Sequence, residues 1–110
     1  MLKLNLDFIK LNDNNYTLEP SFIHQCSKLI KSSTLSQKQI DETIELYKTD
    51  KSNNKLHYHK IICKKDKCRK SIAVLNSNQQ YKILLSEQSE SVYFLFIGHH
   101  RKYDRINKSC

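Results

Sequence analysis

The chain has 110 residues, a hydrophobic content of 38% and a formal net charge of +8. These values predict one domain, residues 1–110, with a single small core, and no apolar run has the length of a membrane helix. The N-terminus alternates apolar and polar residues and lacks the continuous apolar region of a secretory signal, so we expect a cytoplasmic protein.

Positive charge is concentrated in the second half of the chain. From residue 55 onward, twelve Lys and Arg side chains stand against four Asp and Glu side chains. This imbalance predicts an anionic partner, which is either nucleic acid or an acidic protein segment. A lysine-rich surface that only keeps a small protein in solution is the alternative interpretation.

The four cysteines do not form an obvious framework. Disulfides are rare in the cytoplasm, so we expect free thiols that are buried or lie near a turn. His59, Cys63 and Cys68 are close enough in sequence for a zinc site to be conceivable. However, the chain contains no Cys-x-x-Cys pair, and we therefore expect no metal and no cofactor.

The first half of the chain predicts two short strands and two helices. Residues 1–12 form an extra strand-like segment, and Tyr16–Glu19 forms a short strand that Pro20 ends. A helix follows, with Ser21 as a possible cap and an apolar face. The second helix has the clearest start, because Ser36 and Gln39 fit a capping box with apolar residues on either side. The apolar positions of the two helices are Phe22, Ile23, Cys26, Leu29, Ile30, Leu35, Ile40, Ile44 and Tyr47.

The second half predicts a three-stranded meander. Residues 72–75, 81–85 and 92–97 are apolar and rich in β-formers, and polar turns separate them. The turn at 76–79 contains asparagines, which tolerate left-handed conformations. The order of elements predicts an α+β fold, in which an N-terminal helical hairpin packs on one face of a mainly antiparallel sheet of four to five strands. Gly98, the only glycine, predicts a positive φ angle or a close backbone approach to a ligand, and a plain strand terminator is the alternative.

Four stretches, in this order, resemble the RelE/ParE superfamily of small bacterial toxins, in its RelE-like mRNA interferase branch. They are Tyr16–Phe22, Lys55–Ile61, the pair Arg69–Val74 and Gln80–Leu85, and Val92–His100. The resemblance covers about residues 16–105. Two departures are that Lys82 stands where the family often has arginine, and that Arg101 stands where many members have an acidic residue. Residues 1–12 have no counterpart in the family.

The resemblance implies the toxin of a type II toxin–antitoxin pair, which cleaves messenger RNA, often in the ribosomal decoding site. It also implies an acidic antitoxin as partner. Metal-independent cleavage by the 2′-hydroxyl of the RNA needs a base, an acid and cations around the phosphorane. Side chains of these types stand in the second half, which has no cluster of Asp and Glu for two magnesium ions.

The candidate site residues fall into two groups. For catalysis we expect His100, His99, Lys82 and Arg69, with His100 as the better match to the family's catalytic histidine. For RNA binding we expect Arg101, Lys102, Tyr103, Lys70, Lys65 and Lys67, with Tyr103 stacking on a base or donating to a phosphate. His99 is expected to point to the opposite face of the strand from His100.

Two other functions are compatible with the same residues. The first is a ParE-like toxin that inhibits a protein target such as DNA gyrase, although the histidines count against it. The second is a basic RNA-binding module without catalysis, in which cations hold phosphates and aromatic rings stack. Retained toxicity after His100→Ala would favour a binding mechanism.

Overall fold

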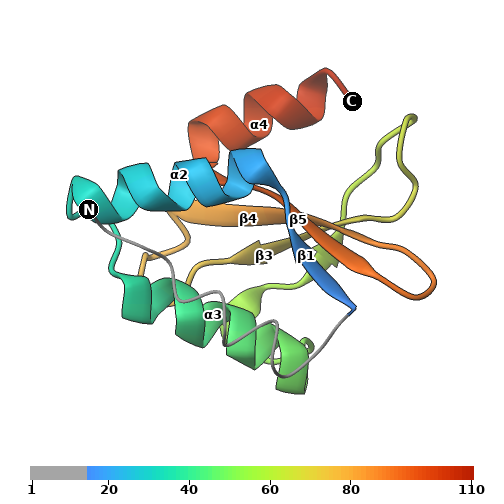
Figure 1. Ribbon diagram of the computed structural model, residues 1–110. Coiled ribbons are helices and arrows are strands. Elements are labelled where there is room, and N and C mark those ends of the chain that lie inside the picture. Colours follow the sequence, from blue (N-terminus) through green and yellow to red (C-terminus); the bar gives the residue numbers. More distant parts are fainter. Residues whose placement is uncertain (1–14) are drawn as a thin grey trace.

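The computed structural model describes residues 15–110 (Figure 1). The strand expected in residues 1–12 lies outside the described residues. The elements in chain order are β1 Tyr16–Leu18, α2 Pro20–Lys31, α3 Gln37–Asp50, the 3-10 turn η1 Asn54–Leu56, β2 His59–Lys60, β3 Arg69–Ala73, β4 Tyr81–Glu87, β5 Val92–His99 and α4 His100–Lys108. No helix among residues 15–110 is long and apolar enough to cross a lipid bilayer.

One mixed sheet organises these elements, with the strand order β1-β5-β4-β3-β2. The pairs β2–β3, β3–β4 and β4–β5 are antiparallel, and β1 pairs with β5 in parallel. The meander that the sequence predicts is therefore the centre of the sheet. The α+β prediction and the mainly antiparallel sheet are confirmed.

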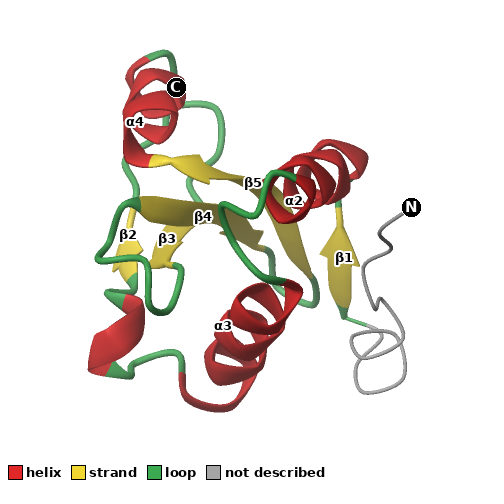
Figure 2. Ribbon diagram, turned by 90° about the vertical axis from the view of Figure 1, so that its left-hand side faces the viewer, coloured by secondary structure: helices red, strands yellow, loops and turns green. Residues whose placement is uncertain are grey.

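The two faces of the sheet carry two separate cores. Helices α2 and α3 run in opposite directions along one face, where Phe22 and Ile40 pack with Ile83 and Phe94. On the other face, Leu84, Phe96 and Tyr103 form a smaller core under α4. Figure 2 shows α3 and α4 on opposite sides of the strands. The helical hairpin is thus confirmed, whereas α4 was not expected from the sequence.

The starts of the two hairpin helices differ in how well the sequence predicts them. At α3 the capping box is confirmed, since the Gln39 N–H donates to Ser36 Oγ at 3.0 Å and Gln39 Oε1 accepts from the Ser36 N–H at 3.0 Å. At α2 the Ser21 cap is wrong, because Pro20 is the first helical residue and Glu19 is the N-cap. Proline is favoured there because its missing N–H would have no intrahelical partner.

The β3–β4 turn contains three residues in the left-handed region, Asn76, Asn78 and Gln79, with φ of 58°, 53° and 61°. The prediction that asparagine supplies left-handed backbone here is confirmed. The turn also holds one end of α3, because Gln39 Nε2 donates to the carbonyl oxygens of Leu75 and Asn76 at 2.9 and 3.1 Å.

The φ angle of Gly98 is not positive, so the backbone conformation does not require glycine at this position. Glycine is required because a larger residue has no space. A Cβ at this position would lie 2.6 Å from Cζ of the buried Phe96 ring. The crowded neighbour is therefore a side chain of the same strand and not the ligand that the sequence led us to expect.

Gly98→Ala is expected to lower the free energy of unfolding by about 1–3 kcal/mol, because the Phe96 ring must move within a packed core. Urea unfolding of the single variant measures this cost. In a Phe96→Leu background the ring is gone, so the same change is expected to cost less, by at least about 0.5 kcal/mol. Additive losses in the double variant would contradict the contact.

The Glu87 carboxylate at the end of β4 contacts side chains of α3 and β3 and of the segment that connects α3 to β2. Tyr47 OH donates to Oε2 and Tyr58 OH donates to Oε1, the latter at 2.6 Å. Lys51 Nζ lies 3.4 Å from Oε2 and Lys70 Nζ lies 3.8 Å from Oε1. Burial raises the pKa of Glu87, but the two tyrosine hydrogen bonds and Lys51 outweigh this effect and hold the pKa below its ordinary value.

Glu87→Gln is expected to lower the free energy of unfolding by about 1–3 kcal/mol at neutral pH. Because the folded-state pKa is depressed, the carboxylate stabilises the fold above its unfolded pKa, and this contribution is lost as the pH falls through the folded value. Urea unfolding across that range should therefore show the gap between the variant and the parent narrowing with acid. The exposed Glu90→Gln is the matched control, and an equal loss there would contradict the assignment.

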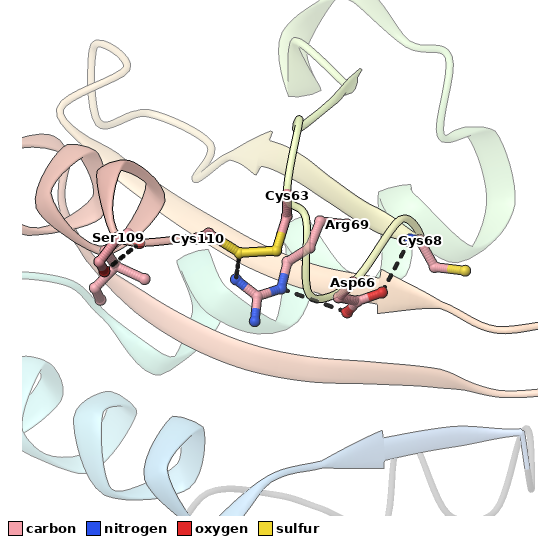
Figure 3. The surroundings of a disulfide bond; sticks show 7 residues. Cys63, Asp66, Cys68, Arg69, Ser109 and Cys110 are labelled. Carbon is pink, nitrogen blue, oxygen red and sulfur yellow. Dashed lines mark hydrogen bonds and ion pairs between the residues drawn. A yellow bond between two sulfur atoms is a disulfide. The ribbon is translucent and has the colours of Figure 1, made fainter.

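Cys63 and Cys110 form a disulfide, with Cα atoms 4.9 Å apart, so the expectation of four free thiols is wrong for this pair (Figure 3). The link fastens the end of the chain, just after α4, to the β2–β3 loop. Cys26 and Cys68 are free, and burial raises the pKa of Cys26 to about 12. Because Cys63 is bonded, it cannot join His59 and Cys68 in a zinc site. Within residues 15–110, no cluster of three or more His, Cys, Asp or Glu side chains could hold a metal.

Candidate active site

The last strand delivers its two histidines into the start of α4. His99 ends β5 and is the N-cap of α4, and His100 is the first helical residue. The His100 N–H donates to the Gln80 carbonyl oxygen at 2.8 Å, which fixes the helix start against the beginning of β4. The sequence signal for α4 is the apolar spacing of Tyr103, Ile106 and Cys110, which the surrounding charges obscure.

His99 has a capping role. Its Nδ1 accepts a hydrogen bond from the Arg101 N–H at 3.2 Å, and its ring meets the Tyr81 ring edge-on with centroids 5.3 Å apart. Desolvation, His100 and Arg101 all lower the pKa of His99, which favours the neutral ring that a cap needs. The His99 and His100 rings lie with centroids 4.3 Å apart, so the expectation that they point to opposite faces is wrong.

The Asp104 carboxylate acts on both Lys82 and His100. Lys82 shares the parity of Leu84 on β4 and therefore faces α4, away from the helical hairpin, as expected. Burial lowers the pKa of Lys82, and the Asp104 carboxylate opposes this shift. His100 Nδ1 lies 3.8 Å from Asp104 Oδ2, one helical turn further along α4. Sequence reasoning missed Asp104, and its signal is the i, i+4 spacing from His100 on a helix.

Arg69 lies apart from this group. Lys82 is opposite Ala73 in the register, whereas Arg69 is opposite Ser86 at the other end of β3. Four residues of strand separate the two positions by about 13 Å. Arg69 instead pairs with Asp66, Nε to Oδ2 at 3.4 Å, and its Nη1 donates to Cys110 Sγ at 3.4 Å. The structure thus does not place Arg69 with His100.

The structure also separates some of the expected RNA-binding residues from the group around His100. Tyr103 is 6% exposed and packs in the smaller core, so the expectation that it stacks on a base is wrong. Burial raises the pKa of the Tyr103 hydroxyl. Lys70 is turned toward Glu87, away from the His100 group. The remaining four, Arg101, Lys102, Lys65 and Lys67, are exposed, the first pair on α4 and the second in the β2–β3 loop.

Solved structures of small toxins match this architecture. A copper-bound mutant toxin from Helicobacter pylori superposes with a TM-score of 0.65 at 16% identity, over 80% of this chain and 96% of that one. The Escherichia coli DinJ–YafQ complex gives 0.66 at 11% identity, over 82% and 97%. The RelB–RelE antitoxin–toxin complex from Methanococcus jannaschii gives 0.56 at 22% identity, over 81% and 96%. No protein-family model and no curated protein matches the sequence.

These similarities define the class of fold. At such low identity they establish shared architecture and not shared chemistry. The chain has the fold of the RelE- and YafQ-like toxins, as the sequence resemblance predicts.

Proposed function

We propose that this chain is the toxin of a type II toxin–antitoxin pair and that it cleaves messenger RNA without a metal. The observation that carries the proposal is the group of Lys82, His100 and Asp104 on the α4 face of a RelE-like sheet. His100 accepts the proton of the attacking 2′-hydroxyl as the 2′-O–P bond forms, and Lys82 stabilises the charge on the phosphorane. The P–O5′ bond then breaks, and a solvent water protonates the departing 5′-oxygen to give the 5′-hydroxyl end. Asp104 orients the His100 ring.

The remaining roles follow from exposure and charge. Arg101 and Lys102, on the exposed first turn of α4, hold flanking phosphates. An acidic antitoxin segment is the natural partner of a surface with this charge, and one of the similar structures is an antitoxin–toxin complex. The toxin acts on messenger RNA, either free or on the ribosome.

The experiment is an analysis of RNA ends produced by the purified chain in the presence of a metal chelator. Attack by the 2′-hydroxyl leaves a 2′,3′-cyclic phosphate and a 5′-hydroxyl, so both ends are expected, with ribosomes supplied in a parallel reaction. A substrate with a single 2′-deoxy nucleotide at the mapped site is the control and should stay intact. Cleavage of that substrate, or cleavage only after a divalent metal is added, would contradict the mechanism. Absence of cleavage in both reactions would contradict the function.

A further inference from the structure

The exposed side of α4 carries a row of cations. Arg101, Arg105 and Lys108 are all exposed and follow the i, i+4, i+7 spacing of one helical face. Tyr103 and Ile106 occupy the face turned to the sheet. The row therefore runs along the outside of α4 for about 10 Å, starting beside His100 and ending near the disulfide.

The β2–β3 loop presents more positive charge at the far end of this row. Lys64, Lys65 and Lys67 are exposed, while Cys63 between them and β2 is buried. The one acidic residue of the loop, Asp66, is drawn inward, where it accepts from the Cys68 N–H at 2.9 Å and pairs with Arg69 (Figure 3). Arg69 thus neutralises the carboxylate that would otherwise oppose the three lysines.

The Cys63–Cys110 disulfide holds the row and the loop together. Lys64 directly follows Cys63, and Lys108 lies two residues before Cys110. Both ribbon views place the loop beside the C-terminal end of α4. We call the resulting surface the cationic strip, made of Lys64, Lys65, Lys67, Arg101, Arg105 and Lys108. Within residues 15–110, none of the ion pairs involves any of these six side chains.

We propose that the cationic strip binds the phosphodiester backbone of single-stranded RNA, several nucleotides away from the bond that His100 addresses. Identifying the polymer as RNA rests on the proposed function. The strip begins beside His100, so a chain cleaved there would continue along α4 and reach the loop. A linear array of exposed cations suits a polymer that carries one negative charge per nucleotide.

The test is binding of a fluorescent 2′-deoxy single strand, which cannot be cleaved through a 2′-hydroxyl, followed by anisotropy at several salt concentrations. Lys64→Gln, Lys65→Gln and Lys67→Gln are combined in one variant. For single strands each phosphate contact contributes about 0.7 to the salt slope, so losing three is expected to reduce the slope by about 2. The same loss weakens binding about a hundredfold at about 0.1 M salt.

The matched control removes three exposed lysines elsewhere, Lys28, Lys31 and Lys38, on the α2–α3 side. This variant has the same net charge and is expected to keep both the parent slope and cleavage of RNA. Equal losses of affinity and salt slope in the two triple variants would contradict the proposal that the cationic strip binds RNA. No loss in the variant that lacks Lys64, Lys65 and Lys67 would contradict it as well. A parent that binds no oligonucleotide but binds a glutamate-rich peptide would also overturn it and favour an acidic protein segment.

A second experiment removes the disulfide and leaves all six cations in place. The double variant Cys63→Ser, Cys110→Ser is expected to lose part of the salt slope while circular dichroism shows an intact fold, because the loop is no longer held beside α4. An unchanged slope would overturn the role of the disulfide. If the chain binds the oligonucleotide through the cationic strip but cleaves no RNA, the proposed function alone is refuted. If it cleaves RNA but its binding does not depend on the strip, only the proposal that the strip binds RNA is refuted.

Discussion

Replacing His100 with alanine is expected to slow RNA cleavage by about 10²- to 10⁴-fold, the range that a positioned proton-transfer group contributes. The ring lies at the start of α4, where Asp104 Oδ2 is 3.8 Å from Nδ1 and Lys82 faces the same side of the sheet. The measurement is single-turnover cleavage of a labelled RNA at saturating protein, which separates the chemical step from binding. In cells, the same substitution should abolish growth arrest.

His24→Ala is the matched control, because His24 is exposed on α2, which packs on the other face of the sheet. Its cleavage rate should equal that of the parent. A His100→Ala variant that cleaves at the parent rate would remove His100 from the mechanism. Growth arrest that persists without cleavage would instead favour inhibition by binding, as in the ParE-like alternative.

Loss of the Cys63–Cys110 disulfide is expected to cost about 4 kcal/mol of unfolding free energy, from the loop closed by residues 47 apart. The cross-link limits the unfolded chain more than it changes the folded contacts, so most of the fold should persist in its absence. The strongest local effect should fall on α4, whose core with the sheet is small. Urea unfolding with and without a reductant measures the difference.

The variant Cys63→Ser, Cys110→Ser controls for other effects of the reductant. It should unfold at the same urea concentration in both conditions, and that concentration should match the reduced parent. A parent that shows no shift on reduction would contradict the cross-link. A shift in the double variant would point to Cys26 or Cys68.

Features that depend on neighbouring residues could be predicted from the sequence. The capping box at Ser36, the asparagine turn at Asn76–Asn78 and the alternation that turns Lys82 away from the hairpin helices are all local, and the structure contains them. The type and order of the main elements follow from the same short-range patterns.

Features that depend on strand register or on distant partners could not be predicted from the sequence. Residue type marked Arg69 as a candidate, but its position along β3 is set by pairing with β4 and separates it from His100. The disulfide joins residues 47 positions apart, and no spacing rule indicates the pair. Helix α4 is short and strongly charged, and Tyr103 became a core residue only because a helix turns it toward Leu84 and Phe96.

The parallel pairing of β1 with β5 limits how early the chain can fold during its synthesis. Tyr16 lies opposite Val92, so the only strand that pairs with β1 within residues 15–110 is synthesised long after it. Phe22 of α2 likewise packs on Phe94. Until β5 leaves the ribosome, the apolar face of α2 lacks this partner, and contacts between such distant residues form slowly. Since His100 follows β5 directly, this side chain and the last strand of the described sheet emerge together.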